Sequence, residues 1–123
     1  MATSTEQTII TKYRDPGAPY LSARRIADAL GVTMAELAAL AGVARNTLTG
    51  KSSARTVDSA LSPLVRIIAL AADMSGDDSR AAIWFKHLPI PGWAGKTASD
   101  LVRERKSAKV LAYLEAVRAG VYA

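Results

Sequence analysis

The sequence contains no cysteine and only one histidine, His87. Without cysteine the chain can form neither a disulfide nor a thiolate metal site, which fits a reducing cytoplasm. Ser99, His87 and Asp100 are present singly, but nothing in their spacing links them into a catalytic set. There is no glycine-rich phosphate loop after a strand either. We therefore predict no enzymatic activity and no cofactor.

Aromatic residues and long apolar runs are also scarce. Aromatic side chains make up 6% of the sequence although 50% of it is hydrophobic, because alanine dominates the hydrophobic set. Small apolar residues favour closely packed helices over a sheet, so the predicted fold class is all-α. No apolar run approaches the roughly 20 residues that span a bilayer, and residues 1–11 are polar. We expect a soluble, cytoplasmic protein with no membrane partner.

Sixteen lysines and arginines against eleven aspartates and glutamates give a net charge of +5. This excess favours an acidic partner, either a nucleic acid or an acidic protein. The adjacent acids Asp77 and Asp78 are better explained as charges at a helix N-terminus than as metal ligands, so no metal site is predicted.

Helix start and stop signals divide the first half of the chain. Residues 1–20, with two prolines near their end, are predicted to form a flexible arm. A helix should begin after Ser22 and stop at Gly31. Another should begin at a capping box and end near residue 41, and a short one should span residues 44–49 before a loop over residues 51–56.

The second half is predicted to hold the remaining helices. Ser62 and Pro63 have the pattern of an N-cap and a first helical residue, and that helix should run to Gly76. Later helices should run from Asp77 or Asp78 to about residue 86, from a capping pair at Thr97 and Asp100, and over residues 107–119. In total we expect six or seven helices and no strand. Trp84 is assigned to the core, and Trp93 is left open between core and interface.

Residues 30–49 combine two short helices with a glycine-containing turn, which lets a second helix lie in a DNA major groove. The segment from Leu37 to Val57 has three basic residues and no acid, so it attracts phosphates. Leu48 should be buried between outward-pointing neighbours, and arginine and asparagine are suited to reading bases. The predicted DNA-binding residues are Arg45, Asn46, Thr47, Thr49, Lys51 and Arg55. The alternative is a packed helical hairpin with a solvated polar face.

Residues 31–48, GVTMAELAALAGVARNTL, resemble the helix-turn-helix of phage-repressor-like (Xre) regulators. Three positions depart from the family pattern. Met34 stands where a DNA-contacting glutamine is common, Ala44 replaces a capping serine at a cost of about 1 kcal/mol, and Gly50 shortens the third helix. The resemblance implies sequence-specific DNA binding, which these departures should weaken.

A set of residues in the second half resembles the toxin-binding domain of Xre/MbcA/ParS-type antitoxins, over residues 63–123. Ile90 and Ala98 depart from the family pattern, but neither should abolish the fold. The resemblance implies a homodimeric antitoxin that binds its own operator DNA and neutralises a RES-domain toxin that consumes NAD. It also implies a helix-turn-helix region at 21–56 and a dimerisation and toxin-binding domain at 57–123. The motif residues are Trp84-Phe85, Pro89, Pro91, Gly95-Lys96-Thr97, Leu101, Leu114 and Gly120-Val121-Tyr122-Ala123.

In that family the antitoxin's C-terminal end approaches the entrance of the toxin's active site. Our hypothesis is that a tail released by Gly120 blocks this site while three residues of the last helix hold its rim. The alternative is that Val121 packs back as a C-cap contact and Tyr122 is an ordinary surface aromatic. The predicted toxin-binding residues are Lys109, Tyr113, Arg118, Gly120, Val121, Tyr122 and Ala123.

A second basic cluster could meet the toxin's carboxylates or a phosphate, or could be a plain solvated face that Glu104 partly offsets. The cluster consists of Arg103, Arg105, Lys106 and Lys109. A different function also stays open, that of a dimeric helix-turn-helix transcriptional repressor with no toxin partner.

Overall fold

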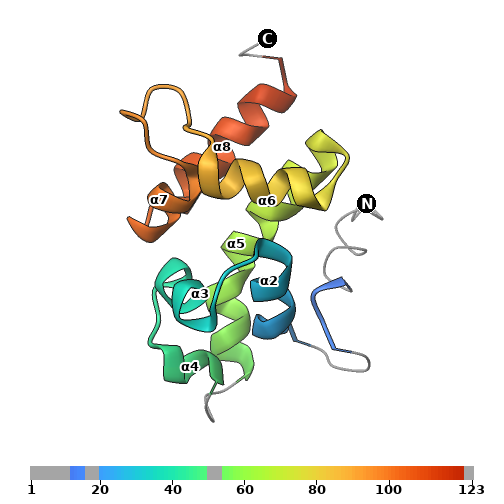
Figure 1. The fold of residues 1–123 in the computed structure, drawn as a ribbon, viewed down its shortest axis with the longest axis vertical. Coiled ribbons are helices and arrows are strands. Elements are labelled where there is room, and N and C mark those ends of the chain that lie inside the picture. The colour runs from blue at the N-terminus through green and yellow to red at the C-terminus, as the bar shows by residue number, and fades with distance from the viewer. Residues whose placement is uncertain (1–11, 16–19, 50–53, 121–123) are drawn as a thin grey trace. The chain divides into compact units, whose positions relative to one another are not determined.

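The computed structural model describes residues 12–15, 20–49 and 54–120. These residues form seven helices and no strand, so the predicted all-α fold is confirmed. None of the described helices is both long and apolar enough to cross a membrane. The helices are α2 (Ala23–Leu30), α3 (Met34–Ala41), α4 (Arg45–Thr49), α5 (Ala54–Ser75), α6 (Asp78–His87), α7 (Ala98–Arg103) and α8 (Ser107–Arg118) (Figure 1).

The chain divides into two compact units, residues 1–65 and residues 66–123. The first unit holds α2, α3 and α4, the second holds α6, α7 and α8, and α5 contributes residues to both. This boundary lies later than the predicted one between residues 56 and 57. It falls within α5, because the helix that was expected to start near Ser62 begins at Ala54 and continues to Ser75.

Pro63 lies inside α5 and not at its start, so the predicted N-cap at Ser62 is wrong. The Ser62 hydroxyl instead donates a hydrogen bond of 2.7 Å to the carbonyl oxygen of Asp58, one turn earlier. Proline has no N–H, so the carbonyl of Ser59 loses its usual helical partner. Burial of apolar side chains on both sides of the proline offsets this loss. These side chains are Leu61, Leu64, Val65, Ile67 and Ile68.

The predicted caps of the first two described helices are confirmed. The Ser22 side chain accepts a hydrogen bond from the backbone N–H of Arg25, and α2 ends at Gly31 in the left-handed conformation. Thr33 and Glu36 form the complete capping box at the start of α3, with both hydrogen bonds at 3.0 Å. These side chains satisfy N–H groups that a helix start otherwise leaves unpaired.

Tyr13 is buried, with only 3% of its surface exposed. Its carbonyl accepts a 2.6 Å hydrogen bond from the N–H of Ser22, and Arg14 pairs with Leu21 in an isolated β-bridge. Burial also raises the pKa of the Tyr13 phenol. The prediction of a flexible arm over residues 1–20 is therefore wrong for residues 12–15. The rest of that arm, apart from Tyr20, lies outside the described residues.

Asp58 ties α5 to the start of α2, because its Oδ1 accepts a 3.0 Å hydrogen bond from the backbone N–H of Leu21. We expect Asp58→Ala to lower the free energy of unfolding by about 1 kcal/mol, since it leaves a partly buried donor unpaired. Asp58→Asn keeps an oxygen acceptor and should lose less. Urea titrations followed by circular dichroism measure both changes. Equal stability of Asp58→Ala and the original chain would contradict this role.

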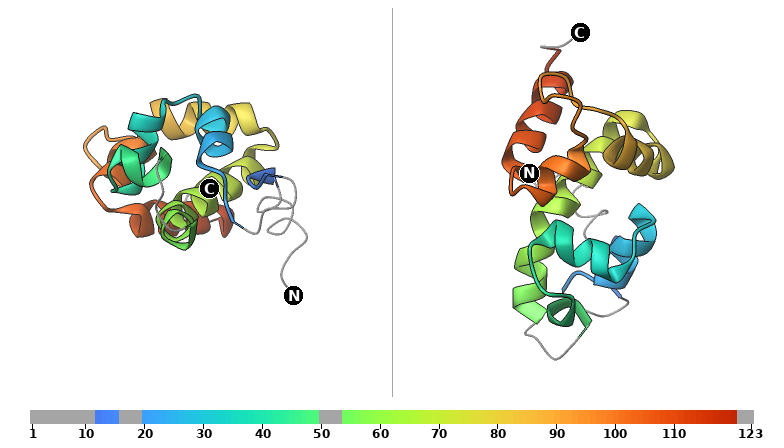
Figure 2. Two further views of the ribbon diagram at one scale, coloured as in Figure 1. Left: turned by 90° about the horizontal axis from the view of Figure 1, so that it is seen from below. Right: turned by 60° about the vertical axis from the view of Figure 1, so that its left-hand side comes forward.

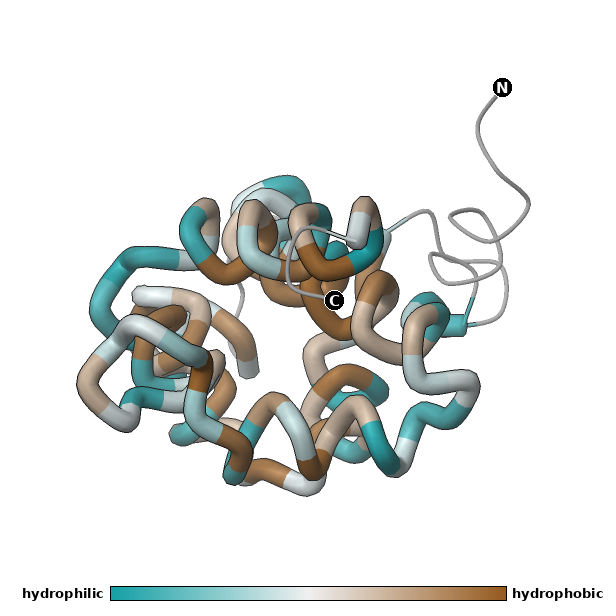
Figure 3. The backbone as a smooth tube through the Cα atoms, turned by 90° about the horizontal axis from the view of Figure 1, so that it is seen from above, coloured by the Kyte–Doolittle hydropathy of each residue, from teal (hydrophilic) through white to brown (hydrophobic). Residues whose placement is uncertain are grey.

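In the second unit, each helix begins or ends at a predicted position. Asp77 caps α6, Thr97 and Asp100 form a complete capping box on α7, and Gly120 follows α8 in the left-handed conformation. The helices carry both hydrophobic and hydrophilic residues along their length (Figure 3), as helices with one buried face do. The buried residues are Ile67, Ile68, Ala71, Ala81, Phe85, Ile90, Ala98, Leu101, Val102, Val110 and Leu114.

The two tryptophans lie outside the centre of this core. Trp84 is only partly buried, whereas its neighbour Phe85 is 1% exposed, so the assignment of Trp84 to the core is wrong. Trp93 is also partly buried, and the Lys106 ammonium lies 5.5 Å from the centre of its ring. Ile90 and Ala98, the two departures from the antitoxin pattern, are both core residues.

Candidate nucleic-acid and protein interfaces

The first candidate surface belongs to the helix pair α3 and α4, which pack against each other (Figure 2). Leu37 and Leu40 of α3 are buried, which fixes that helix in the core of the first unit. Leu48 of α4 is only partly buried, so the prediction that it is buried is wrong. None of the five residues of α4 is buried.

Arg45, Asn46 and Thr49 are exposed on α4, as the predicted base-reading role requires, and Thr47 is partly buried. The Thr49 hydroxyl donates a 3.2 Å hydrogen bond to the carbonyl of Arg45, which occupies its proton. Arg45 and Asn46 have no hydrogen-bond or ion-pair partner for their side chains among the described residues. These two side chains are therefore the ones best placed to bind an external ligand.

Neither of the other two predicted DNA-binding residues is part of the described helix α4. Arg55 is exposed in the first turn of α5, while Lys51 lies outside the described residues. The structure thus brings four of the six predicted residues together on α4. The sequence from Leu37 to Val57, which includes α4, has three basic residues and no acid.

Ala44 precedes α4 without a side chain that can cap it. The backbone N–H of Thr47 donates to the carbonyl of Ala44 at 2.9 Å. We expect Ala44→Ser to raise the free energy of unfolding by about 1 kcal/mol, because its hydroxyl can accept an N–H of the first turn. Ala39→Ser, at an exposed position inside α3, is the control and should give no gain. Thermal unfolding compares the two variants, and equal melting temperatures would contradict the prediction.

The second candidate surface includes α8, where Lys109 and Arg118 are exposed and Tyr113 is partly buried. Lys109 and Arg118 are about two and a half turns apart, so they lie on opposite sides of the helix. The Arg118 Nη2 lies 3.9 Å from Oδ2 of Asp73 on α5. The structure therefore does not bring the three predicted rim residues to one face of α8. Gly120 is exposed, and Val121, Tyr122 and Ala123 lie outside the described residues.

A groove of about 430 Å³ lies between α5, α6 and α8 of the second unit. Its walls are mostly apolar, and sequence reasoning did not predict it. The sequence signal that could have indicated it is the presence of Ile83 and Leu88, two large aliphatic residues to which no role was assigned from the sequence. The large side chains that line it include Met74, Arg80, Ile83, Trp84, Leu88 and Tyr113.

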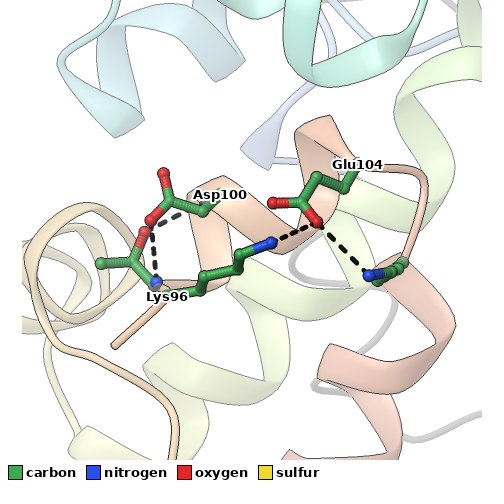
Figure 4. Close-up of polar contacts among 5 residues, drawn as sticks. Lys96, Asp100 and Glu104 are labelled. Carbon is green, nitrogen blue, oxygen red and sulfur yellow. Dashed lines mark hydrogen bonds and ion pairs between the residues drawn. The ribbon is translucent and has the colours of Figure 1, made fainter. Parts of the chain in front are cut away.

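The predicted second basic cluster is partly satisfied within the protein. Oε1 of Glu104 accepts from Nζ of Lys96 at 2.7 Å and from Nζ of Lys106 at 3.3 Å. Figure 4 shows the Lys96 side chain reaching the Glu104 carboxylate, beside the capping carboxylate of Asp100. Arg105 has a left-handed backbone, with φ of 67°, and its Nη1 donates to the Val102 carbonyl at 3.5 Å. The cluster is therefore not a uniform cationic face.

The pKa of the Glu104 carboxyl is lower than its ordinary value of 4.5. The hydrogen bond that Lys96 donates is the main cause, and the hydrogen bond that Lys106 donates contributes less. Because the pKa of Glu104 is lower in the folded than in the unfolded chain, its ionised form stabilises the folded state at every pH above the pKa of the unfolded chain. This stabilisation is lost as the pH falls through the pKa of the folded chain. The effect is small because the group is exposed. We expect Lys96→Met to raise the pKa of Glu104 in an NMR titration, and Lys86→Met to leave it unchanged. An unaltered titration in Lys96→Met would contradict the ion pair.

The carboxylates considered for chemistry serve as helix caps. Asp100 Oδ2 accepts the backbone N–H of Thr97, and Asp77 Oδ1 accepts that of Ser79. Within the part of the chain that the structure describes, no group of three or more acidic or histidine side chains could hold a metal ion. Comparisons with protein-family models, with curated proteins and with solved structures found no match.

Proposed function

We propose that this protein is an antitoxin with two activities. Its second unit binds and neutralises a RES-domain toxin that consumes NAD, and its first unit binds operator DNA to regulate its own synthesis. The protein acts in the cytoplasm as a homodimer and has no catalysis or cofactor of its own. The observation that carries the proposal is the order of two separately compact helical units, each with a different exposed surface.

The first unit supports the DNA-binding part of the proposal. The capping box and Gly42 set the ends of α3, and the next helix presents Arg45 and Asn46 to solvent. Arginine and asparagine can each form two hydrogen bonds to one base in the major groove. The absence of acids between Leu37 and Val57 allows this surface to approach phosphates without repulsion.

The second unit supports the toxin-binding part. Its core places the antitoxin-like motif residues Phe85, Leu101 and Leu114 in buried positions. Gly120 has a φ of 86°, which directs the chain out of the α8 conformation before residues 121–123. In the proposal, these three residues enter the toxin's active-site cleft and obstruct the place where the phosphates of NAD bind.

The test is co-expression with a RES-domain protein encoded beside this chain. An antitoxin forms a stable complex with that protein during purification and preserves the NAD of the host. A chain without residues 121–123 should still purify with the toxin but lose most of its protection of NAD. If the shortened chain protects NAD fully, the tail is not the blocking element.

A helix-turn-helix repressor without a toxin partner is the second candidate, and the exposed Arg45 and Asn46 favour it equally. The same co-expression separates the two functions. A repressor that only dimerises through its second unit neither binds the RES-domain protein nor preserves NAD, while it still binds its operator.

A further inference from the structure

Most of the strongly exposed large apolar side chains of the described residues border the groove between α5, α6 and α8. Met74 is 36% exposed, Ile83 54% and Leu88 51%, and all three line the groove. Clustered apolar surface of this kind is unfavourable in water and marks binding sites. Methionine at such a site adapts its shape to different partners.

The placement of these side chains favours a large occupant over a small ligand. A small molecule that filled the hollow of about 430 Å³ would leave much of Ile83 and Leu88 in water. A helix about 10 Å wide can rest in a groove between helices and cover its rim as well. The occupant that fits these walls is therefore an amphipathic helix.

Arg80 indicates that the bound helix carries a negative charge where it meets the groove. It is the only charged residue among those that line the groove, and its side chain is exposed. It has no ion-pair partner among the described residues. A carboxylate on the bound helix would pair with this guanidinium at the edge of an apolar contact, where water is partly excluded.

The charges of α6 make a second copy of this chain a poor occupant. A symmetric antiparallel pairing of two α6 helices about Ile83 would place Arg80 of one copy near Lys86 of the other. Residues three before and three after the centre face each other in such a pair, so like charges would meet. A partner that brings acidic residues avoids this repulsion.

We infer that the groove binds an amphipathic helix of the toxin, which inserts apolar side chains beside Ile83 and Leu88 and pairs a carboxylate with Arg80. This inference rests on the proposed function for the identity of the partner. In this inference the groove formed by α5, α6 and α8 provides most of the binding affinity for the toxin. The C-terminal residues have a different role, which is to block the toxin's active site.

The experiment measures the affinity of the full-length chain for the purified RES-domain protein, inactivated by mutation. We expect Ile83→Ser and Arg80→Glu each to weaken binding by about tenfold or more, as loss of an interface anchor does. Both positions are exposed, so the variants should fold normally, which circular dichroism checks. Arg66→Glu, an exposed charge reversal on α5 outside the groove, is the matched control and should bind normally.

The outcomes separate this inference from the function on which it rests. If the original chain binds the toxin and both groove variants bind equally well, the inference is overturned and the antitoxin function stands. If the original chain does not bind the toxin, both are overturned. If Ile83→Ser instead dissociates a homodimer in light scattering, a second copy occupies the groove and the inference is wrong. Rescue of Arg80→Glu by exchanging one toxin carboxylate for lysine supports it.

Discussion

Phe85→Ala should lower the free energy of unfolding of the second unit by about 3 to 5 kcal/mol. Phe85 is 1% exposed and is among the largest fully buried side chains. Its helix, α6, packs against α7, so truncation leaves a cavity that neighbouring backbone cannot fill without moving. Since small domains have only about 5 to 15 kcal/mol of stability, the loss should leave this unit close to unfolding.

The matched control is Ile83→Ala on the same helix, at a position that is 54% exposed. This substitution also removes apolar side-chain atoms, but at an exposed position where no cavity can form. The change in the free energy of unfolding should therefore stay within about 1 kcal/mol. Urea titrations followed by circular dichroism compare the two variants. A loss of less than about 1 kcal/mol for Phe85→Ala would show that the core around it is not packed as described.

Arg45→Ala should weaken operator binding by about 1 to 3 kcal/mol, which is roughly a fivefold to 150-fold loss of affinity. The guanidinium is exposed and has no ion-pair partner among the described residues, so it is available for a base. Its two parallel N–H groups match the O6 and N7 acceptors of guanine, which lysine and alanine cannot match in the same way. Gel-shift titrations at constant salt measure the loss.

Arg24→Ala is the control for charge alone, because Arg24 is exposed on α2 of the same unit. Both variants remove one positive charge, but only Arg45→Ala should reduce the difference between operator and unrelated DNA. If both lose affinity equally on both DNA molecules, Arg45 contacts phosphate and does not read a base. If Arg45→Ala binds as the original chain does, α4 is not at the interface.

Local signals in the sequence predicted the fold well where a few adjacent residues determine a structure. Thr33 with Glu36, and Thr97 with Asp100, each place a hydroxyl and a carboxylate at the spacing of a capping box, and both boxes form. Gly31 ends its helix as predicted because a left-handed residue there favours glycine. No tertiary contact is needed for any of these predictions.

Predictions failed where tertiary packing outweighed the local signal. Pro63 has the local pattern of a helix start, but burial of apolar residues before and after it extends α5 through the proline. Tyr13 stands in a polar stretch with nearby prolines, yet it is buried and its backbone carbonyl accepts a hydrogen bond from the N–H of Ser22, and no periodicity reveals either fact. Contacts between residues far apart in the sequence cannot be predicted from the local sequence pattern.

The candidate sites were predictable only in part. The exposure of Arg45 and Asn46 followed from their place in a short polar helix. The groove did not, because it depends on how α8 packs against α5 and α6, which lie about 20 residues or more before it in the sequence. Trp84 is an example. Helical spacing predicts on which face of α6 it lies, but it does not predict which residues cover that face, so the partial exposure of Trp84 was not foreseen.

Both tryptophans of the chain, Trp84 and Trp93, lie in the second unit, whereas the buried Tyr13 lies in the first. Fluorescence excited at the red edge of the absorption band, where tyrosine does not absorb, therefore reports on residues 66–123 alone. Comparing its transition with one from a probe of the whole backbone is a direct test of whether the chain melts in one step or two. The protein thus carries a natural optical label on one half and needs no added dye.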